Sequence, residues 1–190
     1  MKKYLIILEG IATSGKTTLL KNLEHTLSSS YKVKVFTEDE TLMTIVENRR
    51  FEVANTLMHD LLTKFRTAPV DIILTDRYHF THIFRTRENL SSISELEDTL
   101  IESFSPHVFL LTIQEEKISE RVQDARNRRD KWLGKEGTIE EKTKYYIDQQ
   151  QKMRELARQS KIPVTEIDTT NMNWIEITDK IIKDSLIIRN

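Results

Sequence analysis

The stretch that decides the fold is Gly10-Ile11-Ala12-Thr13-Ser14-Gly15-Lys16-Thr17, which matches the pattern G-x-x-x-x-G-K-[ST]. An apolar run at 4–8 precedes it, and a helical pattern of leucines over 19–27 follows it. In such a loop the glycines let the backbone approach phosphates, while loop N–H groups and the following helix N-terminus point at the anion. The sequence therefore predicts a phosphate-binding loop, with these contacts to a bound nucleotide: Gly10, Thr13, Ser14, Gly15, Lys16, Thr17 and Thr18.

Two side chains of this loop carry the predicted chemistry. Lys16 is expected to reach the β- and γ-phosphates, and the Thr17 hydroxyl is expected to ligate Mg²⁺. The cofactors predicted for this protein are therefore ATP and Mg²⁺.

Short apolar runs alternate with helical patterns along the chain. The runs are rich in β-branched residues and continuous, as in strands that are buried on both faces; they cover 4–8, 33–36, 70–74, 108–112 and 164–167. Pro69, Pro106 and Pro163 stand at or just before such runs and indicate where strands begin. We expect one α/β domain over 1–190, with a parallel sheet of about five strands and helices on both faces.

Composition excludes several classes of protein. The chain has 190 residues, a net charge of -1 and no cysteine, so disulfides and thiolate metal sites are excluded. The chain lacks the excess of basic residues that would suggest nucleic acid as a partner, and it has no apolar run long enough to span a bilayer. We expect a cytoplasmic protein that acts on small molecules.

An acidic residue closes the third apolar run. Asp76 follows Ile72-Ile73-Leu74-Thr75, at the position where the carboxyl end of a buried strand is expected. In phosphate-binding-loop proteins, such a carboxylate serves the metal ion beside the phosphates. Asp76 is therefore predicted to act with Thr17 in binding Mg²⁺.

The residues after this acid carry a family resemblance. Asp76-Arg77-Tyr78 followed by Thr81 resembles the D-R-Y-x-x-[ST] motif of thymidylate kinases, and Glu9-Gly10 resembles the start of their phosphate-binding loop. Deoxynucleoside kinases are the second family that it resembles. The resemblance covers almost the whole chain. It implies transfer of the γ-phosphoryl of ATP·Mg to a nucleoside monophosphate that Arg77 positions, and it makes a homodimer a possible assembly.

A basic segment resembles the lid of these kinases. It is expected at about 124–140, and by this resemblance its arginines close over the ATP phosphates and neutralise the transferring group; they are Arg126, Arg128 and Arg129. The alternative is a solvated basic helix face.

Glu38 supports a different acceptor. It follows the second apolar run, where deoxynucleoside kinases carry an acid that takes a proton from a sugar hydroxyl, and Ala12 replaces the acid usual in thymidylate kinases. Glu38 is thus a candidate base for a nucleoside or another hydroxyl compound, or else a solvated acid at a helix start. With Tyr78 and Phe80, His79 and His82 are expected either to line an acceptor pocket or to lie at the edge of a helix that packs its aromatic side chains on the sheet.

A nucleotide-dependent switch without kinase activity is the remaining alternative. A GTPase would need an N-K-x-D motif late in the chain, and the sequence has none. Acceptor-dependent formation of ADP distinguishes a kinase from such a switch.

Overall fold

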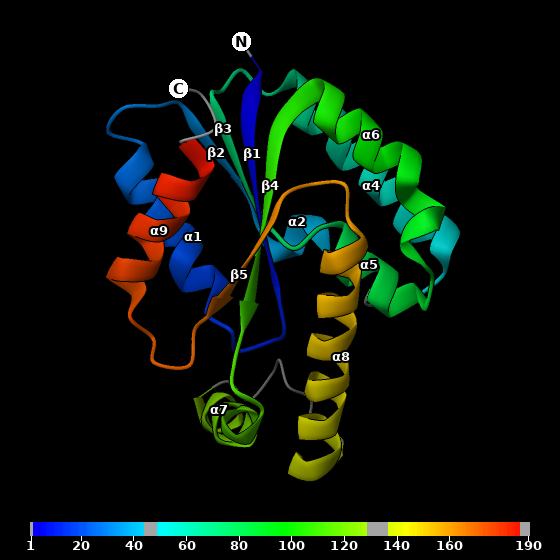
Figure 1. Ribbon diagram of the computed structural model, residues 1–190, viewed down its shortest axis with the longest axis vertical. Coiled ribbons are helices and arrows are strands. Elements are labelled where there is room, and N and C mark those ends of the chain that lie inside the picture. Colours follow the sequence, from blue (N-terminus) through cyan, green and yellow to red (C-terminus); the bar gives the residue numbers. More distant parts are fainter. Residues whose placement is uncertain (1, 44–48, 129–136, 187–190) are drawn as a thin grey trace.

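The computed structural model describes residues 2–43, 49–128 and 137–186, with the backbone alone at 126–128. Its core is a five-stranded parallel sheet in the order β2-β3-β1-β4-β5 (Figure 1). The strands are β1 (Lys3–Gly10), β2 (Val33–Phe36), β3 (Ile72–Asp76), β4 (Phe104–Thr112) and β5 (Val164–Asp168). The predicted α/β fold is confirmed.

Helices cover both faces of this sheet (Figure 1). They are α1 (Lys16–Leu27), α2 (Glu38–Thr41), α4 (Phe51–Thr67), α5 (His79–Thr86), α6 (Ser94–Ser103), α7 (Glu115–Arg128), α8 (Ile139–Gln159) and α9 (Trp174–Leu186), with a 3₁₀ helix at Leu90–Ile93. Leucines of α1 and isoleucines of α9 share one apolar cluster with the sheet. Apolar residues of α4, α5, α6 and α8 form a second cluster with its opposite face. These six helices thus each bury an apolar stripe against the sheet.

The strands differ in burial more than the apolar runs suggest. The three inner strands are almost wholly buried, whereas β2 and β5 are partly exposed because each forms an edge of the sheet. Pro106 lies inside β4 rather than at its start. It is tolerated there because β5 pairs with β4 only from Val108 onward, which leaves one side of Pro106 without a strand partner.

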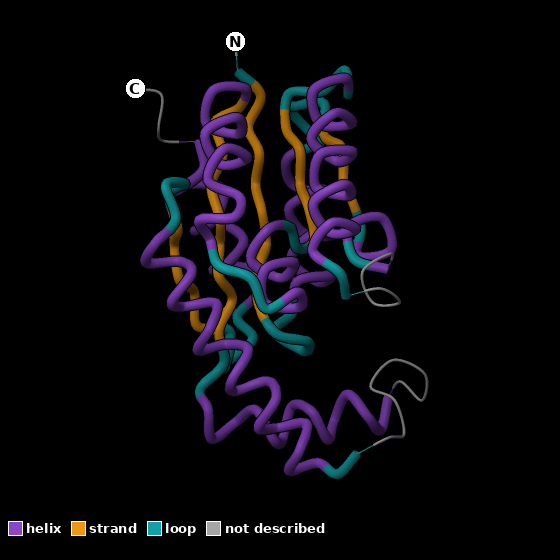
Figure 2. The backbone as a smooth tube through the Cα atoms, turned by 90° about the vertical axis from the view of Figure 1, so that its right-hand side faces the viewer, coloured by secondary structure: helices purple, strands orange, loops and turns teal. Residues whose placement is uncertain are grey.

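Two helices extend beyond the carboxyl end of the sheet (Figure 2). α7 and α8 pack together through a third apolar cluster that also contains Ile11 of the phosphate-binding loop. The buried amide of Gln150 fixes α8 to the end of β4, since it accepts from the N–H of Ile113 and donates to its carbonyl, both at 2.8 Å. The predicted lid, about 124–140, spans the end of α7 and the start of α8, and its middle, 129–136, lies outside the described residues.

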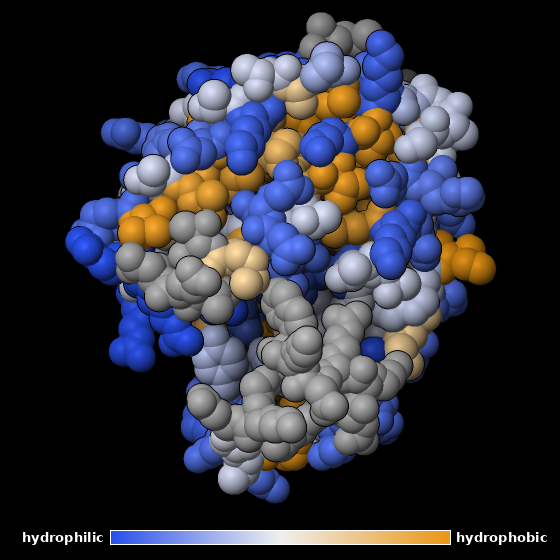
Figure 3. Space-filling view, turned by 180° about the vertical axis from the view of Figure 1, so that it is seen from behind, coloured by the Kyte–Doolittle hydropathy of each residue, from blue (hydrophilic) through white to orange (hydrophobic). Residues whose placement is uncertain are grey.

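The back of the molecule is mainly hydrophilic, with hydrophobic residues exposed between the charged ones in its upper half (Figure 3). No helix in the described part of the chain is both long and apolar enough to cross a membrane.

Candidate active site

Two glycines shape the loop between β1 and α1. Gly10 has φ +144° and Gly15 has φ +89°, a backbone region that side chains disfavour. A Cβ atom on Gly10 would lie 2.4 Å from the carbonyl oxygen of Leu111, and one on Gly15 would lie 2.2 Å from the ring of Trp174. Both positions therefore require glycine, because atoms of neighbouring elements pack directly against the backbone and leave no room for a side chain.

Lys16 folds back over this loop. Its Nζ donates to the carbonyl oxygens of Gly10, at 3.1 Å, and Ile11, at 2.8 Å, and the residue is only 5% exposed. Burial, aided by the nearby positive charge of Arg77, lowers the pKa of Lys16 to about 8. Thr17 and Thr18 are exposed at the first turn of α1, so their hydroxyls are open to a ligand.

Parallel pairing brings Asp76 to the mouth of the loop, because Leu8 of β1 is in register with it. Asp76 is 2% exposed, and its Oδ1 is buried without a hydrogen-bond partner among the described residues. Burial raises the pKa of this carboxyl against the opposing effects of Lys16 and Arg77. An unsatisfied buried oxygen of this kind fits a ligand that brings positive charge.

Arg77 joins three separate segments. Its Nη1 donates to the carbonyl oxygen of Gly10 at 2.7 Å and to Thr81 Oγ1 at 3.4 Å, and its Nε donates to Glu38 Oε1 at 2.9 Å. Arg77 is 4% exposed, whereas 27% of the Glu38 side chain remains accessible. Burial favours the neutral carboxyl, but the charges of Arg77 and Lys16 prevail and lower the pKa of Glu38. Glu38 is therefore ionised, partly open to solvent and beside the phosphate-binding loop.

Glu9 holds the helix that carries this motif. Its Oε1 accepts from the N–H groups of Tyr78, Phe80 and Thr81 at 2.9–3.2 Å, and its Oε2 accepts from the Thr81 hydroxyl. The carboxylate thus satisfies free donors at the start of α5. This role of Glu9 is not predicted from the sequence; the one local signal for it is an acid at the end of the first apolar run.

The residues present fit Mg²⁺. The orphaned Asp76 Oδ1 and the exposed Thr17 hydroxyl are hard oxygen donors at one edge of the sheet. Within the described residues, no three His, Asp or Glu side chains gather as a metal site. Mg²⁺ commonly takes few protein ligands and completes its coordination with substrate phosphates and water.

The aromatic and histidine side chains after Arg77 are structural. Tyr78 and Phe80 are fully buried in the core, His79 pairs with Glu97 at 3.2 Å, and His82 Nε2 lies 2.8 Å from the carbonyl oxygen of Thr41. Of the two alternatives, packing on the sheet is confirmed. Both histidines are fully buried, each with a partner at Nε2, whereas the Nδ1 of each has none among the described residues.

The basic lid residues are placed only in part. Arg126 and Arg128 belong to the last turns of α7, but their side chains, and Arg129 entirely, lie outside the described residues. Upstream in the same helix, Arg121 donates to the carbonyl oxygens of Thr169 and Thr170 at 2.8 and 3.1 Å. It thereby ties α7 to the loop after β5.

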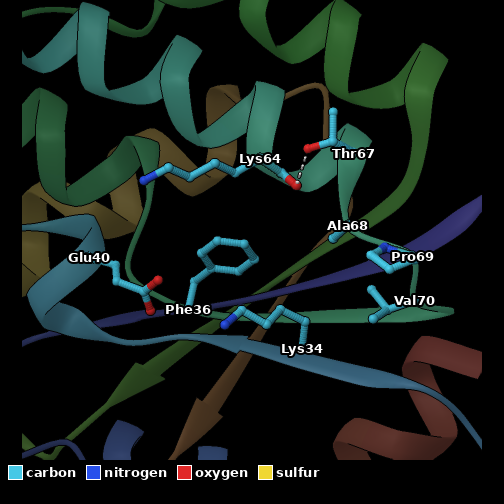
Figure 4. Close-up of a pocket in the computed structure, with 8 residues that line it drawn as sticks. All are labelled: Lys34, Phe36, Glu40, Lys64, Thr67, Ala68, Pro69 and Val70. Carbon is cyan, nitrogen blue, oxygen red and sulfur yellow. Dashed lines mark hydrogen bonds between the residues drawn. The ribbon is translucent and has the colours of Figure 1, made fainter.

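A separate pocket of about 390 Å³ lies at the sheet edge between β2 and α4 (Figure 4). Phe36 and the 68–70 loop form its apolar wall, and Lys34, Glu40 and Lys64 line its rim. None of its eight lining residues belongs to the phosphate-binding loop or to the Asp76-Arg77 pair. The pocket is therefore distinct from the candidate active site.

Solved structures share this fold at low sequence identity. The YorR protein of Bacillus subtilis, in complex with phosphorylated GDP, is 19% identical with a TM-score of 0.61, covering 94% of this chain and 93% of its own. Thymidylate kinase from Candida albicans is 15% identical with a TM-score of 0.61, covering 96% and 91%. Shikimate kinase from Acinetobacter baumannii, in complex with shikimate, is 16% identical with a TM-score of 0.60, covering 98% and 95%.

These likenesses show that the chain has the fold of the P-loop kinases. No protein-family model matches the sequence. A search of curated proteins finds no match either.

Proposed function

We propose that this protein is a P-loop phosphotransferase that moves the γ-phosphoryl group of ATP·Mg to a hydroxyl group of a small molecule. The observation that carries the proposal is the ion pair of Glu38 with Arg77, at 2.9 Å, beside a phosphate-binding loop that contains Lys16. A hydroxyl acceptor must lose a proton during transfer, whereas an acceptor that is already a phosphate need not. An accessible carboxylate at this position supplies the required base.

Each residue then has a defined part in the reaction. The acceptor oxygen attacks the γ-phosphorus, the bond from that phosphorus to the β–γ bridging oxygen breaks, and ADP leaves. The acceptor proton goes to Glu38, whose lowered pKa keeps it ionised and ready to accept. Lys16 stabilises charge on the phosphoryl group, and Arg77 positions both Glu38 and the acceptor.

A metal ion held at this edge of the sheet would supply positive charge that neutralises the phosphates. Thr17 and Asp76 are the residues proposed to hold it. We assign the lid arginines Arg126, Arg128 and Arg129 to closure over the phosphates, as the resemblance implies.

A nucleoside monophosphate is the second candidate acceptor. The Asp76-Arg77-Tyr78 motif with Thr81, held in place by Glu9, favours it. The charge of Glu38 weighs against it, because a carboxylate 2.9 Å from Arg77 Nε repels an acceptor phosphate at that guanidinium.

The test is acceptor-dependent ADP formation from ATP·Mg with matched panels of nucleosides, nucleoside monophosphates and other small hydroxyl compounds. Lys16→Ala is the inactive blank. With a hydroxyl acceptor, Glu38→Gln is expected to lower kcat by about 10²–10⁴-fold while the amide keeps its hydrogen bond to Arg77. The exposed neighbour variant Asp39→Asn is the matched control and retains the parent rate.

The outcomes separate the candidates. A monophosphate acceptor whose turnover changes less than about tenfold in Glu38→Gln would replace the hydroxyl proposal with the nucleotide one. ADP formation that needs no acceptor would identify an ATPase or switch. Unchanged turnover in Lys16→Ala would overturn the assignment of the phosphate-binding loop.

A further inference from the structure

A second arginine lies one helical turn beyond the catalytic edge. Arg85 is four residues after Thr81 on α5, so it shares a helix face with the hydroxyl that contacts Arg77 Nη1. Arg85 is half-buried, and its Nε is buried without a hydrogen-bond partner among the described residues. A buried N–H that lacks an acceptor costs free energy, and an oxyanion of a ligand would remove that cost.

The charges around Arg85 favour an anion. The positive charges of Arg77 and Arg49 act on it, and Glu38, a carboxylate whose charge also reaches it, is already paired with Arg77 at 2.9 Å. The two arginines that act on Arg85 place positive charge around it, which favours a negatively charged ligand.

Two tyrosines of α8 lie near the part of α5 that carries Arg85. The Tyr145 ring centroid lies 5.5 Å from that of Phe84, beside Arg85 on α5, and 5.4 Å from that of Tyr146. Burial raises the pKa of Tyr146, and the charges of Arg77, Arg85 and Glu38 also act on it. α5 and α8 thus border one region that has both positive charge and aromatic rings.

We propose that Arg85 binds an oxyanion of the acceptor, a carboxylate or a phosphate that is separate from the hydroxyl facing Glu38. This inference rests on the proposed function and narrows its substrate class to small anionic hydroxy compounds. One helical turn, about 5–6 Å, separates Thr81 from Arg85, so the anionic group is bound on the same face of α5 as the contact to Arg77 and one turn further along. Arg85 selects the acceptor and does not act on the transferring phosphoryl group.

The experiment compares acceptors that differ only in charge. Hydroxy acids are paired with their methyl esters, and nucleoside 3′-monophosphates with the parent nucleosides, so that carboxylate and phosphate are tested separately. The charged member of at least one pair is expected to be the better substrate. Arg85→Gln should raise its KM at least tenfold and leave the KM for ATP and the rate with the neutral member unchanged, whereas Arg85→Lys should restore part of the affinity.

The matched control is Arg158→Gln, an exposed arginine near the far end of α8, which should behave as the parent protein. Equal turnover of charged and neutral members, or an equal loss for both in Arg85→Gln, would overturn the anion site. If no compound supports turnover, calorimetry with the same compounds decides: binding of a charged member that Arg85→Gln loses upholds the site while the phosphotransferase proposal fails. Equal heats in both proteins would overturn it.

Discussion

Arg77 adopts a left-handed backbone conformation, with φ +67°, which is unfavourable for a residue with a side chain. Its N–H donates to the carbonyl oxygen of Leu8 at 2.9 Å, and its own carbonyl accepts from Thr75 Oγ1 at 3.0 Å. These bonds hold a conformation that directs the guanidinium to Gly10 and Glu38. Strain of about 1–3 kcal/mol at this position is thus offset by the surrounding hydrogen bonds.

The buried His82 makes stability depend on pH. Burial lowers the pKa of His82 to about 3, against about 6.5 in the unfolded chain. The unfolded state therefore binds more protons than the folded state between these values, so this residue's contribution to stability is lost as pH falls from 6.5 toward 3. Between pH 6.5 and 5 the free energy of unfolding should fall by about 2 kcal/mol more in the parent protein than in His82→Gln.

Urea unfolding at a series of pH values measures this difference. His25→Gln, which replaces an exposed histidine of α1, is the control and should follow the parent curve. Parallel pH curves for the parent protein and His82→Gln would show that His82 does not titrate in this way.

At the scale of an element, the carboxylate of Glu9 stabilises the start of α5. Glu9→Gln keeps the shape of the side chain but removes the charge that accepts from three backbone N–H groups. We expect a loss of about 1.5–3 kcal/mol in the free energy of unfolding, the range for hydrogen bonds to a charged partner. Faster amide exchange should appear first at Tyr78, Phe80 and Thr81.

Glu24→Gln is the control for this change, because Glu24 is an exposed residue of α1 and its replacement should alter stability by no more than about 0.5 kcal/mol. Equal stability and equal amide protection in Glu9→Gln and the parent would contradict the role given to Glu9.

At the scale of the whole molecule, the candidate nucleotide site depends on contacts between segments that are far apart in sequence. The ring of Trp174 in α9 packs against Gly15, and Arg121 of α7 donates a hydrogen bond to the loop after β5. A ligand that binds only the folded state adds about 2.7 kcal/mol to the free energy of unfolding when its concentration is about 100 times its Kd. ATP·Mg at such a concentration should therefore raise Tm by about 5–10 °C. Lys16→Ala should lose most of this increase.

The exposed Lys21→Ala variant of α1 is the matched control and should keep the full increase in Tm. A thermal shift that is the same in Lys16→Ala and in the parent protein would place the nucleotide away from the phosphate-binding loop.

The sequence by itself determined the fold class and the phosphate-binding loop. Both depend on local signals, namely the spacing of glycines, the alternation of apolar runs with helical stripes, and an acid at the end of a buried strand. These signals place Lys16, Thr17 and Asp76 at one edge of the sheet, because parallel strands bring their carboxyl ends together.

Only the tertiary structure decided how the remaining groups pair. Glu38 and Arg77 are 39 residues apart and Glu9 and Tyr78 are 69 apart, so no local pattern shows that they touch. The same holds for His79 and His82, whose Nε2 atoms have buried partners, and for Arg85, whose Nε has none among the described residues. The physical reason is that burial and partner choice depend on packing between elements, which local spacing does not encode.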